Sequence, residues 1–108
     1  MIPQVNESDW KLFRSRLPGW QEAYMERLNQ AYIDLLSGPG SAADKFWKLE
    51  KRVREDKQSA GIIVEMTKSK MELNIMNLLA DGAITLDDLS DFSEDLRSKM
   101  AFVLGNKG

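Results

Sequence analysis

The sequence predicts an all-α fold, a single-domain compact bundle of about five helices joined by short connections. Apolar residues recur at helical spacing in most segments, and no segment alternates apolar and polar residues with the period of a strand. The 108 residues, 43% of them hydrophobic, have room for one domain with one core. We expect residues 1–7 to be extended or flexible and residues 105–108 to form a flexible tail. Turn signals that divide the helices lie at Pro18-Gly19, Gly38-Pro39-Gly40, Ser59-Ala60-Gly61 and Gly82.

The first two predicted helices meet at a proline. Ser8 is the expected N-cap of a helix over residues 8–16, which Pro18-Gly19 should end because the residue before a proline resists the α conformation. A broad apolar stripe predicts the second helix over residues 19–37. Gly38-Pro39-Gly40 should stop it, since glycine takes the left-handed cap and proline cannot continue a helix.

The third helix should begin at Ser41, whose hydroxyl would cap it together with Asp44, and end near residues 59–61. Its apolar stripe of Ala43, Phe46, Leu49 and Val53 is expected to face the core. Trp47 lies one residue off this stripe, so either the stripe is wide at that point or Trp47 is partly exposed.

A central fourth helix is expected between residues 62 and 81. Its start stays open, because Ile62, Ile63 and Val64 can form an extended lead-in to a cap at Thr67 or Ser69. Gly82 should close it. Residues 85–88 cap the last segment, which is either one helix or a short turn followed by a helix over about residues 94–104, with Ser93 as a second N-cap. Met66, Met71, Met76 and Met100 are expected to fill the core, together with most of the aromatic residues.

Reaction chemistry is scarce in this chain. It has no histidine and no cysteine, which are the commonest general base and the best nucleophile, and both are common metal ligands. It also has no glycine-rich phosphate loop. We therefore expect no enzyme, no cofactor and no metal site. A carboxylate-based enzyme or metal binder would have to use Asp87, Asp88 and Asp91.

Two surfaces are candidates for binding a partner. Trp47, Lys48, Lys51 and Arg52 of the third helix form the first, because an exposed tryptophan is a candidate interface hot spot. A solvated helix face is the simpler interpretation of the three bases, which lie on the side away from Phe46, Leu49 and Val53. Asp87, Asp88, Asp91 and Asp95 form the second, an acidic docking face if this segment is one continuous helix. Helix capping is the simpler interpretation of these acids, since the helix dipole stabilises negative charge near an N-terminus.

The N-terminus lacks the basic and apolar stretches of a secretory signal, and no apolar run approaches the length of a membrane span. We expect a cytoplasmic protein that does not use a membrane. The net charge of −2 gives no overall attraction to nucleic acid.

Several segments resemble one family over nearly the whole chain. They are residues Ser8–Phe13, Leu17–Trp20, Tyr24–Leu28, Phe46–Arg52 and Asp81–Ser93. The family consists of small uncharacterised all-helical proteins from Gram-positive gut bacteria, whose members often carry the label "multidrug transporter". The lack of a membrane span in this sequence argues against that label. The resemblance implies a bacterial source and no site residues.

These observations predict a small non-catalytic protein-interaction module whose partner is a protein, either a second copy of the chain in a homodimer or another protein. One alternative is a nucleic-acid-associated regulator that uses the third helix with Lys68 and Lys70. Another is an inhibitor of a host protein, encoded by a mobile element.

Overall fold

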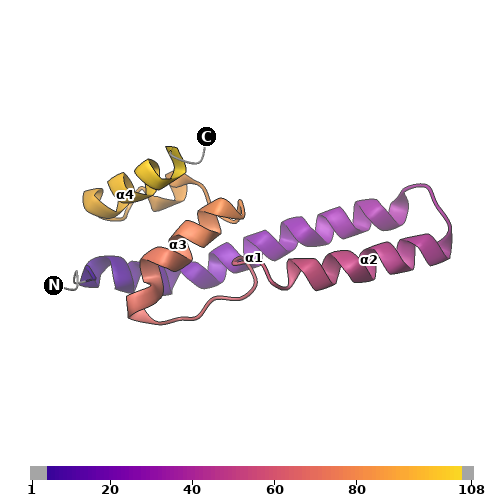
Figure 1. The fold of residues 1–108 in the computed structure, drawn as a ribbon, viewed down its shortest axis with the longest axis horizontal. Helices are drawn as coiled ribbons and strands as arrows, with labels where there is room; N and C mark the ends of the chain where they lie inside the picture. Colours follow the sequence, from indigo (N-terminus) through magenta and orange to yellow (C-terminus); the bar gives the residue numbers. More distant parts are fainter. Residues whose placement is uncertain (1–4, 106–108) are drawn as a thin grey trace.

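The computed structural model describes residues 5–105, and none of these residues lies in a β-strand. The all-α prediction is therefore confirmed for this part of the chain. Four α-helices and two short 3₁₀ helices follow one another (Figure 1). They are α1 (Glu7–Ser37), α2 (Ala42–Asp56), η1 (Lys68–Lys70), α3 (Met71–Ala80), η2 (Leu86–Leu89) and α4 (Glu94–Gly105).

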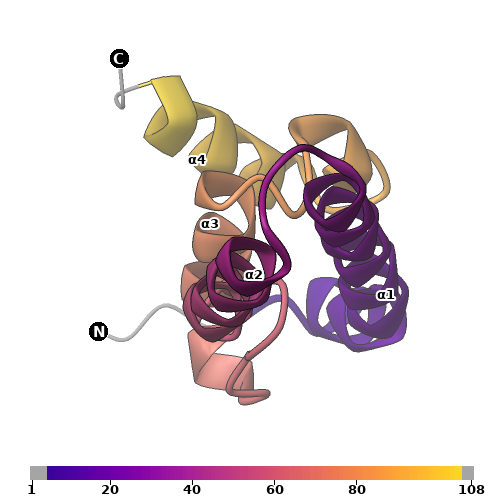
Figure 2. The same ribbon diagram turned by 90° about the vertical axis from the view of Figure 1, so that its right-hand side faces the viewer.

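The molecule has two parts that share α1. The first half of α1 packs with α3, η2 and α4, and we call this part the base. The second half, residues 25–37, runs beside α2 and projects from the base as a helical hairpin, which we call the arm (Figures 1 and 2). The described chain measures 57 × 28 × 24 Å, with a radius of gyration of 16.7 Å. A compact domain of this length has a radius of about 13 Å, so the expectation of a compact bundle was wrong.

The two predicted N-terminal helices are one helix that continues through Pro18. Phe13, before the proline, and Trp20, after it, pack on each other, with ring centroids 6.2 Å apart. Trp20 also packs against Phe92 of the base at 6.0 Å. Both sides of the proline are thus held by one core. Pro18 and Gly19 are exposed, so the carbonyl that loses its helical hydrogen bond can lie toward water, and packing outweighs the local preference for a break.

Several helix ends match the sequence prediction. The Ser41 hydroxyl accepts a hydrogen bond from the Asp44 backbone N–H at 3.1 Å and caps α2. Gly82 has a φ of 74°, and the N–H groups of Gly82 and Ala83 bond back to the last turn of α3. This is the pattern of a Schellman cap. After α1 the detail differs, because the positive φ belongs to Gly40 and not to Gly38.

The two open questions about the C-terminal half are answered by the backbone. The segment after residue 61 is an extended lead-in, and Thr67 flanks η1 in an extended conformation. The last segment is a turn followed by a helix, with Ser93 as the cap of α4, because its hydroxyl accepts from the Leu96 N–H at 3.2 Å. The expected extended start and flexible tail fall mainly on residues 1–4 and 106–108, which lie outside the described part; Glu7 and Gly105 are helical.

The core lies entirely in the base. Its buried side chains come from the first half of α1, from α3 and from the segments that follow α3. They are Phe13, Leu17, Met71, Ile75, Leu78, Leu79, Ala83, Ile84, Leu89, Phe92, Leu96 and Met100. Met71 and Met100 are core residues as predicted, whereas Met66 is 41% exposed and Phe102 is 70% exposed. Met66 is exposed because residues 63–67 run over the surface. Phe102 is exposed because it lies on the outer side of α4, the last element.

A buried carboxylate joins the two ends of the described chain. Asp9, in the first turn of α1, is only 3% exposed. Its two oxygens accept hydrogen bonds from the Ser93 backbone N–H at 2.8 Å and the Ser93 hydroxyl at 2.6 Å. The cap of α1 itself is Asn6 rather than the expected Ser8, since the Asn6 side chain accepts from the Asp9 N–H. Asp9 therefore fixes α4 against the start of α1.

Replacing Asp9 with alanine should lower the free energy of unfolding by about 2–3 kcal/mol, because it leaves two donors of Ser93 without a charged acceptor. Urea denaturation followed by tryptophan fluorescence measures this. Asp34→Ala, at an exposed position in the arm, should change stability by less than about 0.5 kcal/mol. Equal midpoints for the Asp9→Ala and Asp34→Ala variants would contradict this role for Asp9.

Candidate functional site

The predicted partner surface lies on α2, and the structure exposes all four of its residues. Trp47 is 63% exposed, which answers the question that the sequence left open. Lys48 and Lys51 are exposed on the same helix. Arg52 is exposed too, but its guanidinium lies over the Tyr32 ring of α1, 5.8 Å from the ring centroid. Arg52 thus belongs to the contact between α1 and α2, whereas Trp47 and the two lysines are exposed to solvent.

Phe46 was expected in the core, and that prediction was wrong. It is 62% exposed and packs edge-on against Trp47, with ring centroids 5.0 Å apart. No residue of α2 is buried. The cause is architectural: α2 packs on the far half of α1 only, and within the described residues no third element covers the other side of the pair. A helical stripe in the sequence predicts an apolar face, but it does not say that the chain itself covers that face.

An apolar groove runs along one flank of the arm. A hollow of about 370 Å³ is lined by Phe46, Leu49, Glu50, Val53, Arg54 and Lys57. A second hollow of about 240 Å³, between α1 and α2, is lined by Met25, Leu28, Asn29, Tyr32, Val53, Asp56, Lys57 and Ile62. Val53 and Lys57 line both hollows, so the two adjoin on this flank of the arm. We call the two together the arm groove; it runs from Phe46 near the tip of the arm to Met25 and Ile62 near the base.

One hydrogen bond ties the two helices of the arm together. The Tyr32 hydroxyl of α1 donates to the Asp56 carboxylate at the end of α2, with the two oxygens 2.5 Å apart. Burial, and next the bond to Asp56, raise the pKa of Tyr32 to about 12. The phenol is therefore neutral and donates throughout the physiological range.

The arm meets the base at an elbow built around Tyr24. The Tyr24 hydroxyl accepts a hydrogen bond from the Ser59 hydroxyl at 2.9 Å. The backbone at Gly61 lies so close to the Tyr24 ring that a Cβ atom there would overlap three ring atoms. Two further bonds hold the returning chain, from Gln21 to the Ile62 carbonyl at 3.3 Å and from the Ala60 N–H to Asp81 at 2.9 Å.

Arg27 locks the other side of the same elbow. Its guanidinium lies 5.5 Å from the centroid of the Tyr24 ring. It also donates to the carbonyls of Gly82 and Ala83, at 2.9 and 3.2 Å, just after α3 ends. These contacts were not foreseen from the sequence, where Arg27 is one charged residue on a helix and Gly61 is one turn signal. The direction in which the arm leaves the base is thus set by side chains of α1.

The predicted acidic docking face is not assembled. Asp88 caps η2 by accepting from the Thr85 N–H at 2.8 Å, and Asp91 pairs with Arg16 at 2.7 Å. Asp95 pairs with Lys99 at 3.3 Å, while Asp87 is exposed beside a different hollow. The chain turns between η2 and α4, so these acids do not share one helix face. Local capping and pairing account for three of the four.

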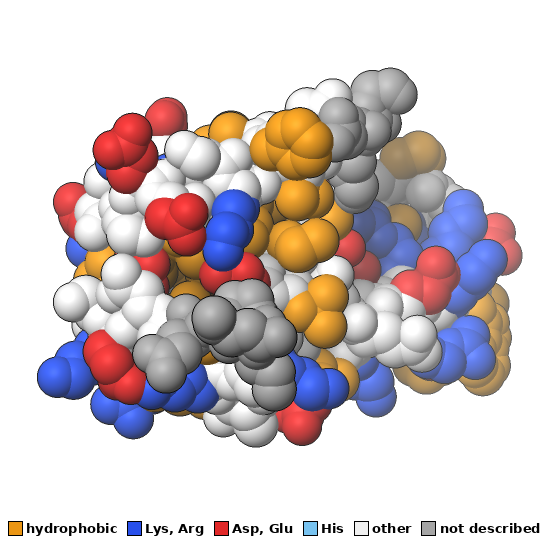
Figure 3. All heavy atoms as spheres, turned by 60° about the vertical axis from the view of Figure 1, so that its left-hand side comes forward, with side chains coloured by type: hydrophobic (Ala, Val, Ile, Leu, Met, Phe, Trp, Pro, Cys, Tyr) orange, Lys and Arg blue, Asp and Glu red, His pale blue; other side chains and the backbone are white. Residues whose placement is uncertain are grey.

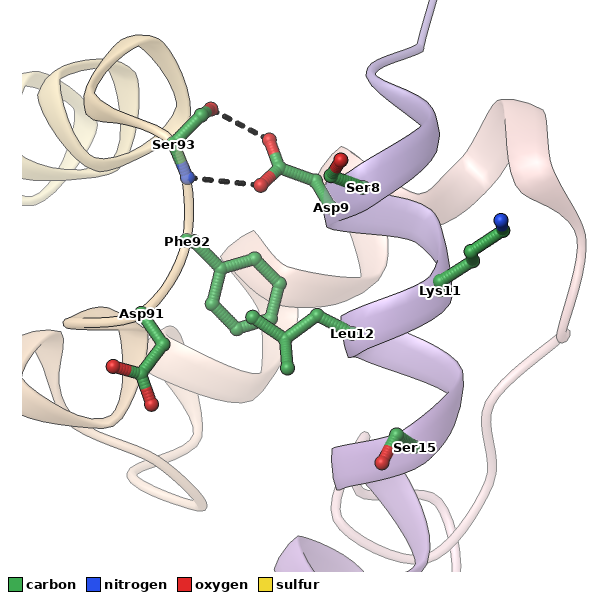
Figure 4. A pocket seen from close by; sticks show the side chains of 8 residues that line it. All are labelled: Ser8, Asp9, Lys11, Leu12, Ser15, Asp91, Phe92 and Ser93. Atoms are coloured by element: carbon green, nitrogen blue, oxygen red, sulfur yellow. Dashed lines mark hydrogen bonds between the residues drawn. The ribbon is translucent and has the colours of Figure 1, made fainter.

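A hollow of about 590 Å³ lies between the start of α1 and the turn before α4 (Figure 4). Asp9 and Ser93 approach each other across it, as the dashed lines in Figure 4 show. The Ser93 hydroxyl donates to Asp9 and accepts from Leu96, so both its hydrogen-bonding roles are taken. The Asp9–Ser93 contact in this hollow therefore holds α4 against the start of α1, and the Ser93 hydroxyl is not an activated nucleophile.

The surface of the base is otherwise mixed. Figure 3 shows hydrophobic side chains gathered toward the C-terminal end of the chain, with acidic and basic side chains interleaved elsewhere. Leu73 of α3 and Phe102 of α4 are each exposed by half or more. Across residues 5–105, no three acidic side chains gather in an arrangement suited to a metal ion. In the same range, every helix is too short or too polar to cross a bilayer.

No family model, curated protein or solved structure matches this chain.

The arm should loosen at high pH. A raised pKa means that the folded state favours the neutral phenol, so the contribution of Tyr32 is fully present below pH 10 and is lost as the pH approaches 12. The difference in unfolding free energy between the native chain and Tyr32→Phe should therefore shrink between about pH 9 and pH 12. Denaturation at several pH values measures it. A difference that stays constant over this window would contradict the Tyr32–Asp56 bond.

Gly61→Ala should destabilise the chain by about 1–3 kcal/mol, because the new methyl group would push the Tyr24 ring out of the elbow. Gly19→Ala is the matched control, since a Cβ atom at this helical position meets nothing within 4 Å. It should stabilise the chain by about 0.5–1 kcal/mol. Thermal unfolding of both variants checks the opposite signs, and a Gly61→Ala variant as stable as the native chain would refute the close approach.

Proposed function

We propose that this chain is a non-catalytic protein-interaction module and that the arm is its docking surface. One observation carries the proposal: α2 buries none of its residues, yet it presents Phe46 and Trp47 side by side, each more than 60% exposed. Aromatic residues exposed next to an apolar groove are typical of sites that a partner covers.

A comparison of binding free energies favours Phe46 and Trp47 as the main source of affinity. An aromatic side chain offers about 150–250 Å² of surface, so covering the exposed part of Phe46 or Trp47 would contribute about 3 kcal/mol each. Exposed lysines such as Lys48 and Lys51 contribute at most about 1 kcal/mol each through ion pairs. In this proposal the aromatic side chains hold the partner, and the charges around them select its orientation.

The elbow supports the same proposal. Tyr24, Arg27 and Gly61 fix the direction of the arm, so its orientation on the base is set before a partner arrives. A surface that is ordered in advance loses less conformational freedom on binding. A host-protein inhibitor encoded by a mobile element would be one form of such a module, and it would use the same arm.

A second candidate function, single-stranded nucleic-acid binding, rests on Trp47. An exposed indole between Lys48 and Lys51 could stack on a base while the lysines contact phosphates. The net charge of −2 and the acids of α2 weigh against it. Binding to a mixed-sequence oligonucleotide that weakens as salt rises, and that Trp47→Ala abolishes, would favour it over the protein partner.

The decisive experiment places a photoreactive benzoylphenylalanine at Phe46 in the native cell, with Phe102 as the matched control position. We expect crosslinks to a protein from Phe46 and not from Phe102. Phe46→Ser combined with Trp47→Ser should abolish that association and shift the free energy of unfolding by less than about 1 kcal/mol, since both residues are exposed. A double variant that unfolds, or crosslinks from Phe102 alone, would count against the arm.

A further inference from the structure

We infer that the partner of the arm is a second copy of this chain, and that two arms pack antiparallel about a two-fold axis to form a four-helix bundle. This inference rests on the proposed function and adds the identity of the occupant. It is carried by three features of the arm groove: its shape, its charges and its length.

The shape of the groove is self-complementary. A two-fold interface uses the same patch twice, so the patch must hold both a projection and a matching hollow. Phe46 projects at the tip end of the groove, and the hollow between α1 and α2 lies at its base end. That hollow measures about 240 Å³ and is lined by Met25, Leu28 and Ile62 among others. An apolar cavity of roughly 150 Å³ is enough to bind benzene, so the hollow accepts a phenylalanine ring.

The spacing of the two features fits an antiparallel pair. Phe46 and Val53 lie about 10 Å apart along α2, and Phe46 and Lys57 about 16 Å. A two-fold axis midway between Glu50 and Arg54 brings Phe46 of one copy over the hollow of the other, where Val53 and Lys57 lie, and the reverse contact forms at the same time. Two apolar flanks, each made of two antiparallel helices, then close into one bundle core.

The charges beside the groove favour the same direction. Glu50 lies in the middle of the groove, and Arg54 and Lys57 lie toward its base end. A parallel two-fold pair would place each of these charges opposite its own copy, and like charges that face each other destabilise an interface. An antiparallel pair about an axis between Glu50 and Arg54 instead brings Glu50 of each copy opposite Arg54 of the other.

The length of the arm sets the strength of the pair. α2 has 15 residues and is about 22 Å long, so the contact falls near or below the roughly 1,200 Å² of total area that stable complexes bury. The dimer should therefore be reversible, with a dissociation constant in the micromolar range, and it should respond to concentration.

Sedimentation equilibrium on the purified full chain tests the inference over a range of about 1 μM to 1 mM. We expect a monomer–dimer equilibrium that Phe46→Asp shifts by at least about 100-fold toward monomer, while circular dichroism stays unchanged. Trp47→Ser should weaken the dimer as well, because Trp47 packs edge-on against Phe46, whereas Phe102→Ser on α4 should leave the equilibrium within about threefold. Glu50→Lys and Arg54→Glu should each weaken the dimer, and the double variant should regain affinity.

Spin labels test the direction. The chain has no cysteine, so Ala43→Cys near the tip and Gln58→Cys near the base of the arm accept one label each, and both positions are exposed. Mixing the two labelled chains should give a tip-to-base distance shorter than the tip-to-tip distance within Ala43→Cys dimers. A tip-to-tip distance that is the shorter of the two would overturn the antiparallel arrangement.

The outcomes separate this inference from the proposed function. A chain that is monomeric at 1 mM overturns self-pairing, and if the Phe46 probe still crosslinks to another protein in the cell, the docking arm stands with a different partner. A dimer that survives Phe46→Asp and is lost in Phe102→Asp overturns the inference, because the interface is then on the base. A monomer whose Phe46 probe captures nothing overturns both.

Discussion

The length of α1 governs the rest of this structure. Its 31 residues form a helix about 46 Å long, whereas α3, η2 and α4 cover only its first half. An uncovered apolar half of a helix has to be packed by something, and the chain supplies α2. A pair of helices can bury only the seam between them, so the outer flanks of both stay open. The exposed Phe46 and the arm groove follow directly from that shortage of covering elements.

The polar contacts that hold the other elements against α1 are spread unevenly along this helix. At its start, the Asp9 carboxylate holds α4 through two charge-assisted bonds in a buried place, where such bonds are strong. At its middle, Tyr24 and Arg27 hold the returning chain at the elbow. Beyond the elbow, the bond from Tyr32 to Asp56 is the main polar link between the arm helices. The arm is thus the part that should open at the lowest free energy.

Sequence reasoning worked where a single turn of helix decides the outcome. The caps at Ser41 and Ser93 and the helix stop at Gly82 depend on residues close by, and all three were predicted. It failed where distant packing decides, as at Pro18, because only the fold shows that Phe13 and Trp20 share one core. The exposure of Trp47 was one of two alternatives that the sequence left open, because a residue next to an apolar stripe lies either at its edge or outside it. The groove was missed, since Phe46 on an apolar stripe looks the same whether or not another element covers it.

A docking role also accounts for how so short an arm can stay helical. Helices of about 15 residues are marginal by themselves in water and depend on packing. α2 has a capped start, a pair from Glu50 to Arg54 and the contact with Tyr32, but no buried side chain. A second arm laid along the groove would bury Phe46 and Val53 and would add the packing that α2 lacks. Association and arm order would then reinforce each other, which is the behaviour expected when a surface is completed only by its partner.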